Sequence, residues 1–241
     1  SLSVLPLVGT GRVFDAAVQQ GWLTRMGPKA ALPSGGFSNQ SLRGLLADLS
    51  AGLPTLSWTQ WRLVRRLGHH HQPIVAVGDL LPLLMAWSSG SPFGFIGTPK
   101  SDYTWRSGPG RARSDCYHLL KGSEWDPWEW SLMRSRRCRV VAMRDCLTAR
   151  GLRRKGVDAL SPGNPMMDGL RIHPLPSALE RCRRVLLLCG SRMPEAQRNL
   201  QRLVRSAMAL SGRVPMALLV AVGAQPDAEA LSDSLEQLGF R

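Results

Sequence analysis

Short apolar runs that end at Gly or Pro alternate with amphipathic stretches along the sequence, and this alternation restricts the fold more than any other feature. It is typical of βαβ units, in which helices join parallel strands. Several runs are apolar throughout, as expected when helices cover both faces of a sheet. The sequence therefore predicts an α/β fold with a parallel sheet and helices on both faces. The expected strands are residues 2–8, 73–78, 93–97, 139–143, 157–160, 185–189 and 216–222.

The amphipathic stretches predict helices between these strands. They cover residues 42–49, 59–67, 80–87, 128–134, 147–155, 194–210 and 228–238. Residues 100–125 have no clear period and are rich in Gly, Ser, Arg and Asp, so a long surface loop is expected there.

Two domains are expected because the composition changes near residues 170–184, where Pro174 and Pro176 interrupt the pattern. We place the first domain at residues 1–172 and the second at residues 173–241. The second piece is shorter than a doubly wound domain of roughly 100–150 residues. We therefore expect the chain to be a fragment of a longer product, lacking a first strand and loop before Ser1 and stopping inside its second domain.

The chain is strongly basic, with 31 Lys and Arg against 17 Asp and Glu, a net charge of +14 and a pI near 11.0. An anionic partner is one explanation of the charge: nucleic acid, an anionic membrane surface or a phosphorylated small molecule. The planar guanidinium group of Arg matches the geometry of a phosphate. A GC-rich coding sequence with solvated Arg side chains is the other. Nucleic acid is the weakest of these candidates, since no recognised module is visible and Arg is spread over both halves.

The five cysteines are odd in number and form no CxxC pair, which favours a reduced compartment and gives no metal-binding pattern. The sequence has neither a secretion signal nor an unbroken apolar stretch long enough for a membrane span. A cytoplasmic protein that needs no metal or cofactor is expected. GxGxxG, GxxxxGK[ST], HExxH and GxSxG motifs are absent, which weakens dehydrogenase, P-loop, zinc-protease and serine-hydrolase assignments.

The strongest local motif is LLLCGSRMPE at residues 186–195, a buried strand that runs into a glycine, an arginine and a helix start. A helix start offers free N–H groups to an anion, a glycine lets the backbone approach, and arginine binds a diphosphate. The alternative is an ordinary strand-to-helix turn with a surface Arg. The residues predicted to bind a donor diphosphate are Gly190, Ser191, Arg192 and Glu195.

Three weaker candidates precede this motif. Asp79 follows the strand IVAVG and could serve as a general base or, by preference, as the N-cap of the next helix. The SPGNPMMD segment contains Gly163, Asn164, Pro165 and Asp168; a structural turn accounts for it, and Asp168 either caps a following helix, which is favoured, or faces a cleft between the domains. Gly35, Gly36 and Phe37 form a loop whose glycines permit close backbone approach to an acceptor.

In their order along the chain, LPLVGTG, PSGGF, IVAVGD, FGFIGTPKSDY, SPGNPMMDGL and LLLCGSRMPE resemble the lipid-A-disaccharide synthase-related proteins, a divergent bacterial branch of the lipid-A-disaccharide synthase family. The resemblance spans nearly the whole chain. It implies a GT-B fold of two Rossmann-like domains, an N-terminal acceptor-side domain and a C-terminal nucleotide-sugar domain. It also implies transfer of a sugar from a UDP donor to a lipid-linked acceptor at the cytoplasmic membrane surface, without a metal, in lipid A biosynthesis.

By the same resemblance, Arg192 lies near the donor diphosphate and Gly163, Asn164 and Pro165 lie at the domain junction. Asp79 stands near the family's catalytic segment GIDAPDF, which reads GDLLPLL here, so that Leu83 replaces the second carboxylate. Two alternatives to glycosyl transfer stay open. One is a degenerate, non-catalytic protein that binds a sugar nucleotide or lipid, and the other is a UDP-sugar epimerase-like enzyme that shares the fold and the donor site.

Overall fold

The computed structural model describes residues 2–9, 11–28, 32–33, 42–106, 110, 113–169, 173–180, 182–190, 193–210, 216–222, 227–237 and 239. The chain divides into two compact units, Ser1–Gly169 (unit 1) and Leu170–Arg241 (unit 2), which are described separately. The assignment of two predicted domains to an acceptor side and a nucleotide-sugar side stays a prediction.

Unit 1 contains a four-stranded parallel sheet in the order β3-β4-β5-β6. Its strands are β3 (Ile74–Gly78), β4 (Phe93–Gly97), β5 (Cys138–Met143) and β6 (Ala159–Leu160). A separate parallel pair is formed by β1 (Leu2–Val4) and β2 (Leu23–Arg25). Since neighbours in the large sheet are also consecutive in the sequence, each connection returns to the same edge before the next strand begins.

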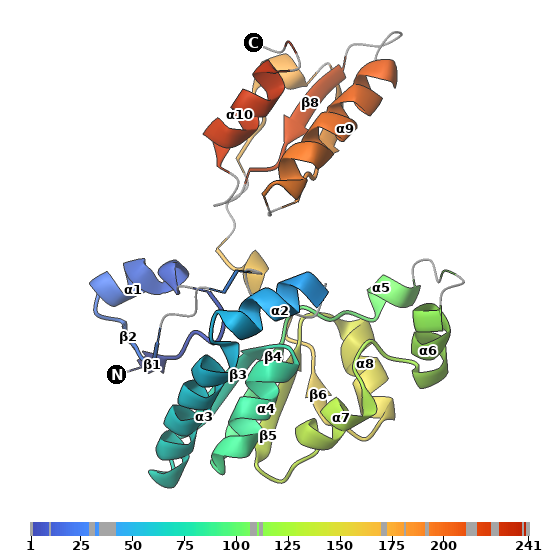
Figure 1. Ribbon diagram of the computed structural model, residues 1–241. Helices are drawn as coiled ribbons and strands as arrows, with labels where there is room; N and C mark the ends of the chain where they lie inside the picture. Colours follow the sequence, from blue (N-terminus) through green and yellow to red (C-terminus); the bar gives the residue numbers. More distant parts are fainter. Residues whose placement is uncertain are drawn as a thin grey trace. The chain divides into compact units, whose positions relative to one another are not determined.

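Helices alternate with these strands and flank the sheet (Figure 1). They are η1 (Arg12–Phe14), α1 (Asp15–Gln19), α2 (Leu42–Ser50), α3 (Leu53–His69), α4 (Leu80–Ser89), α5 (Tyr103–Arg106), α6 (Arg113–Lys121), α7 (Pro127–Met133), α8 (Cys146–Arg154) and η2 (Pro165–Met167). Among the residues described, no helix is both long and apolar enough to cross a membrane.

The core of unit 1 lies between the sheet and the helices α4, α7 and α8. Leu83, Phe95 and Trp125 are fully buried there, and the rings of Phe95 and Trp125 meet edge to face with centroids 5.5 Å apart. Gly97 must lack a side chain at this place, because a Cβ would lie 2.8 Å from Cζ2 of Trp125 and 2.7 Å from Sδ of Met143. The end of β4 is therefore packed directly against the end of β5.

The other face of the large sheet is more exposed than its sequence indicates. Val75 and Val77 are 65% and 54% exposed, and Val140 and Leu160 are exposed as well. The apolar strand sequence predicts burial on both faces, but the described residues leave these side chains largely uncovered.

The expected long surface loop at residues 100–125 is wrong in part. It contains α5 and α6, and Asp102, Lys121 and Trp125 within or beside these short helices are buried. The polar composition of this region reflects buried hydrogen bonds as well as solvent exposure.

Unit 2 is a smaller parallel α/β assembly. Its strands β7 (Arg183–Leu187) and β8 (Met216–Val220) pair in parallel, with α9 (Glu195–Leu210) between them in sequence. η3 (Ser177–Leu179) precedes β7, and α10 (Ala228–Glu236) follows β8. Leu187, Leu200 and Leu231 bring β7, α9 and α10 into one buried cluster.

Candidate functional site

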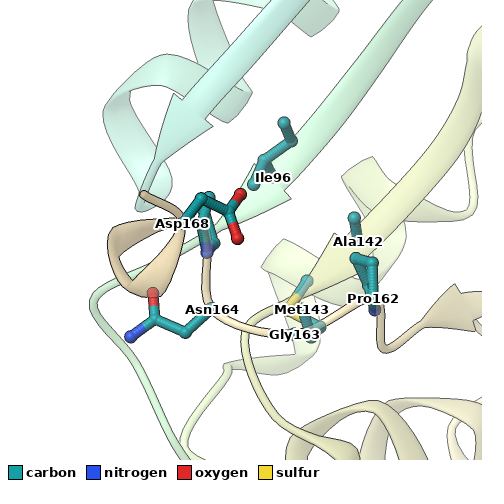
Figure 2. A pocket seen from close by; sticks show the side chains of 8 residues that line it. Ile96, Ala142, Met143, Pro162, Gly163, Asn164 and Asp168 are labelled. Carbon is teal, nitrogen blue, oxygen red and sulfur yellow. The ribbon is translucent and has the colours of Figure 1, made fainter. Parts of the chain in front are cut away.

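The carboxyl edge of the large sheet carries a small pocket. Parallel strands end at the same edge, which is where open α/β sheets bind ligands. The pocket has a volume of about 130 Å³ and lies where β4 and β5 end, next to the segment that follows β6 (Figure 2). It is lined by Ile96, Ala142, Met143, Pro162, Gly163, Asn164, Pro165 and Asp168.

The turn after β6 builds one wall of this pocket. Gly163 has a φ of +111°, a region that favours glycine. The side-chain oxygen of Asn164 accepts a hydrogen bond from the Met166 N–H at 3.2 Å, and Pro165 opens η2. The predicted structural turn is thus present, and the same residues line the pocket.

Asp168 directly follows η2 and ends it. Its side chain lines the pocket (Figure 2). Residues 170–172 lie outside the described residues, so its favoured role as the cap of a following helix stays a prediction.

The pocket offers two polar side chains, those of Asn164 and Asp168, among mainly apolar neighbours. A few placed polar groups in an apolar lining are typical of small-molecule sites, which usually measure roughly 300–1,000 Å³. This pocket is smaller, so it can hold one part of a ligand, such as a sugar ring whose hydroxyls hydrogen-bond to an amide or carboxylate.

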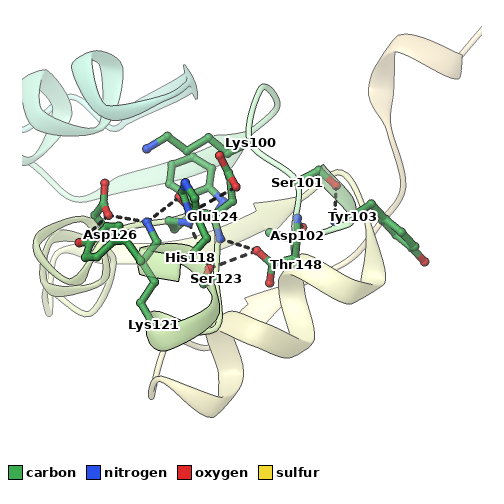
Figure 3. A network of polar contacts seen from close by, with 12 residues as sticks. Lys100, Ser101, Asp102, Tyr103, His118, Lys121, Ser123, Glu124, Asp126 and Thr148 are labelled. Atoms are coloured by element: carbon green, nitrogen blue, oxygen red, sulfur yellow. Dashed lines mark hydrogen bonds and ion pairs between the residues drawn. The ribbon is translucent and has the colours of Figure 1, made fainter. Parts of the chain in front are cut away.

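A polar network fixes the segments that leave β4 and β5 behind this edge (Figure 3). The Ser101 hydroxyl donates to Oδ2 of Asp145 at 2.8 Å, and the Thr148 N–H donates to Oδ1 of Asp145 at 2.7 Å. Arg144 donates through Nη1 to the Thr98 carbonyl at 3.0 Å. Asp145 therefore caps α8 and also joins the segment after β4 to the segment after β5. Met143, the last residue of β5, lines the pocket.

Asp102 is the buried centre of the network. Its Oδ1 accepts hydrogen bonds from the Glu124 N–H at 2.7 Å and from the Ser123 hydroxyl at 3.3 Å. Its own N–H donates to Oγ1 of Thr148 at 2.9 Å. Burial raises the pKa of the Asp102 carboxyl above its ordinary value, although these hydrogen bonds act in the opposite direction. Asp102 does not line the pocket, and its contacts give it a structural role.

Two charged pairs hold the start of α7 beside this network. Glu129 is fully buried, and Lys100 donates to both of its carboxylate oxygens at 2.6 and 2.7 Å while lying over the Trp125 ring. Lys121 pairs with Asp126, the residue before α7. Lys100 compensates the buried Glu129 carboxylate, which would otherwise be costly to keep charged, and Lys121 compensates the partly buried Asp126.

Asp79 lies at the carboxyl end of β3 and caps α4, since its Oδ1 accepts from the Leu81 N–H at 3.4 Å. The favoured cap interpretation agrees with this contact. Its side chain is exposed and does not line the pocket, so the structure does not bring it together with Asn164 and Asp168. A catalytic role for Asp79 stays a prediction.

The predicted diphosphate turn lies in unit 2, between β7 and α9. Gly190 has a φ of +94°, and Glu195 begins α9 and pairs with Arg198 at 2.7 Å. The Asn199 amide donates to the Cys189 carbonyl at 3.2 Å, which holds the strand end against the helix. Ser191 and Arg192 lie outside the described residues, and anion binding at this turn stays a prediction.

The predicted acceptor loop, Gly35, Gly36 and Phe37, also lies outside the described residues. The sequence missed Ile96, Ala142 and Met143 as pocket residues, although each stands at or beside the end of an expected strand, the only signal that could have identified them. Among the described residues, no group of three or more His, Cys, Asp or Glu side chains could hold a metal ion.

No protein-family model and no curated protein matches the sequence. Among solved structures, the whole chain matches 58% of a crystal structure described as "putative UDP-N-acetylglucosamine 2-epimerase from Listeria monocytogenes", with 12% identity and a TM-score of 0.50. It also matches 65% of a UDP complex of MnaA from S. aureus, with 12% identity and a TM-score of 0.45. The chain therefore spans about three fifths of the length of these structures.

At such low identity, the match to the Listeria structure is evidence of fold alone. UDP-N-acetylglucosamine 2-epimerases have a GT-B-like fold, so the predicted fold class is confirmed. Neither structure supports a specific relationship to lipid-A-disaccharide synthase. The chain has a parallel α/β architecture of the GT-B-like type.

Proposed function

We propose that this chain belongs to an enzyme that acts on a UDP-sugar, with epimerisation of the sugar as the first candidate reaction. The observation that carries the proposal is the match of the whole chain, through both units, to a structure described as an epimerase of UDP-N-acetylglucosamine. In this proposal the Gly190 turn of unit 2 receives the diphosphate, because a glycine followed by a helix start leaves backbone N–H groups free for an anion.

The pocket of unit 1 supports the same proposal. It lies at the ligand-binding edge of a parallel sheet and offers an amide at Asn164 and a carboxylate at Asp168. One balanced route to inversion removes the proton from the carbon next to C1 while the C1–O bond to UDP breaks, so that the electron pair forms a C=C bond. UDP then adds back at C1 as a proton returns to the other face of that carbon, and a placed carboxylate can mediate one of these proton transfers. Asp168 is the described carboxylate that lines the pocket, and we assign it this role in the proposal.

Glycosyl transfer to a lipid-linked acceptor is the second candidate. The ordered motifs from PSGGF to LLLCGSRMPE favour it, and it includes peripheral association with the cytoplasmic membrane. A degenerate protein that binds UDP-sugar without turnover is the third, favoured by Leu83 in place of a second carboxylate in GDLLPLL.

The first experiment is a thermal-shift titration of the chain with UDP and with UDP-N-acetylglucosamine, because a ligand that binds the native state raises the unfolding midpoint. We expect both compounds to raise the midpoint, and Arg192→Ala to abolish the shift. Arg198→Ala is the matched control, since Arg198 lies near the start of α9 and already pairs with Glu195. A chain that responds to neither compound would contradict the proposal.

Product analysis then separates the three candidates. UDP-N-acetylglucosamine is incubated with the protein alone, and the sugar nucleotide is examined by NMR. A new epimer without an acceptor supports epimerisation. UDP release only when a lipid acceptor is added supports transfer, and binding without either product supports the degenerate protein.

A further inference from the structure

The amino-terminal edge of the large sheet, opposite the pocket, carries a dense group of cations. Three chain segments reach this edge immediately before β3, β5 and β6: the end of α3, the turn between α7 and β5, and the end of α8. In Figure 1 the carboxyl end of α3 and the turn between α7 and β5 lie at the bottom of unit 1. We call this group the basic edge; it consists of Arg65, Arg66, Arg134, Arg136, Arg137, Arg139, Arg153, Arg154 and Lys155.

The three segments form one continuous surface. A Cβ built on Gly90, in the turn before β4, would lie 3.7 Å from Nη1 of Arg137 and 4.0 Å from Nη1 of Arg65. A Cβ on Gly156, after α8, would lie 3.7 Å from Cδ of Arg134. The α3, α7–β5 and α8 cations are therefore neighbours through the Gly90 and Gly156 turns.

The charge of this edge is not compensated. Among the described residues, no carboxylate forms an ion pair with any cation of the basic edge. Asp158 is the one acidic residue in the segments described at this edge. The carboxylates Asp79, Asp126, Asp145 and Asp168 lie at the opposite, carboxyl edge, so unit 1 has a strong charge asymmetry. Such a surface attracts an extended anionic partner.

The aromatic residues favour a lipid surface over nucleic acid. Single-stranded nucleic acid is held by bases stacked on exposed aromatic faces. Here the edge cations themselves cover the rings: Arg65 lies 5.8 Å from the Trp61 centroid, Arg137 lies 5.7 Å from that of Trp87, and Lys155 lies 5.1 Å from that of Trp130. Trp87 is nevertheless 38% exposed beside Arg137. Tryptophan next to basic side chains is typical of the level of lipid headgroups.

We propose that the basic edge docks unit 1 on an anionic phospholipid bilayer, with arginine guanidinium groups on lipid phosphates and the pocket edge turned away from the membrane. This inference does not rest on the proposed epimerisation, and a pocket edge turned away from the bilayer disfavours transfer to a lipid-linked acceptor in that bilayer. Planar guanidinium groups bind phosphate in a bidentate way, and an anionic leaflet attracts each basic residue near its surface.

Vesicle co-sedimentation tests the proposal with the whole chain. Vesicles contain phosphatidylcholine alone or phosphatidylcholine mixed with phosphatidylglycerol. We expect binding to the mixed vesicles only, weakening as salt is added because salt screens exposed charges. The test variant is Arg66→Gln/Arg136→Gln/Arg154→Gln, which neutralises one exposed side chain from each segment. We expect its partition coefficient to fall by about fivefold for each side chain.

The matched control is Arg113→Gln/Arg202→Gln/Arg205→Gln, which removes the same charge from exposed positions outside the three segments of the basic edge. We expect it to bind nearly as well as the unchanged protein, and circular dichroism melts check that both triple variants fold. Equal loss in the two variants would show that net charge alone drives binding and would overturn the proposal. The proposal would also be overturned if the protein did not bind the mixed vesicles, or if it bound a single-stranded oligonucleotide and not the vesicles. None of these measurements uses UDP, so their failure is distinct from failure of the proposed function.

Discussion

The carboxylate of Asp102 packs directly on the backbone of Gly151 in α8, so closely that a Cβ on Gly151 would lie 2.3 Å from Oδ2 of Asp102. This contact joins the segment after β4 to the helix after β5. It exists because residue 151 has no side chain, and because Asp102 is held in place by Glu124 and Ser123.

Gly151→Ala is therefore expected to destabilise the protein. Alanine is better than glycine in a helix by about 1 kcal/mol, but overpacking against a fixed, buried group costs about 1–3 kcal/mol. We expect a net loss in the free energy of unfolding, measured by chemical denaturation. In an Asp102→Ala background the same change meets no carboxylate, so its cost should disappear. Additive effects of the two changes would contradict the contact.

The pH dependence of stability should report the buried state of Asp102. Burial raises the pKa of its carboxyl above 3.8 in the folded chain, so folding takes up a proton there. Its contribution to stability is fully present below the unfolded pKa and is lost as pH rises through the folded pKa. We expect the stability advantage of the unchanged protein over Asp102→Asn to shrink as the pH rises above the unfolded pKa of about 4.

Asp126 acts in the opposite sense but does not disturb this comparison. Burial alone would raise its pKa, yet hydrogen bonds from Lys121 and Tyr117 outweigh burial and hold the pKa below the ordinary value. Its contribution is lost as pH falls, and it is the same in both proteins. A stability difference that grows with pH would contradict the assignment for Asp102.

Gly68→Ala should separate two helices. A Cβ at this position in α3 would lie 2.0 Å from the carbonyl oxygen of Ser89, at the end of α4. Backbone cannot move aside as a flexible side chain can, so we expect a loss of about 3 kcal/mol in the free energy of unfolding. Gly94→Ala is the control, because its Cβ would come no closer than 3.9 Å to Val140. That variant should keep its stability, and an equal loss in both would argue against the helix contact.

Much of the fold could be predicted from the sequence because its strands are short, apolar and bounded by Gly or Pro. β4 has the predicted limits, Phe93–Gly97, and β3 and β5 differ from the predictions by a single residue. Four of the described α-helices and strands were missed. β2, α1 and α5 have three to five residues each, too few for a periodic pattern, and α6, with nine residues, lies in the region expected to be a loop. Exposure of Val75 and Val77 was also not predictable, because the strand pattern does not say whether anything covers a face.

The site was predictable only where a turn has its own sequence signature. Gly163, Asn164 and Pro165 mark a tight turn in the sequence, and they form one wall of the pocket. The opposite wall comes from Ile96 and Met143, whose apolar side chains look like ordinary strand residues. Their place in the pocket depends on strand order, which one sequence does not provide. The basic edge was hidden for the same reason, since its cations come from three separate segments, residues 65–66, 134–139 and 153–155.

Substitutions at Asp79 can separate its cap role from catalysis. Asp79 accepts a hydrogen bond from the Leu81 N–H at the start of α4, and it does not line the pocket. Asp79→Ala should cost about 1 kcal/mol of stability, whereas Asp79→Asn retains a capping oxygen and should leave stability almost unchanged. If the residue acts only as a cap, Asp79→Asn should also convert or bind UDP-sugar as the unchanged protein does. A stable Asp79→Asn variant that still binds UDP but no longer turns over the sugar would instead assign the carboxylate to the reaction, because only the charge and proton-accepting power have been removed.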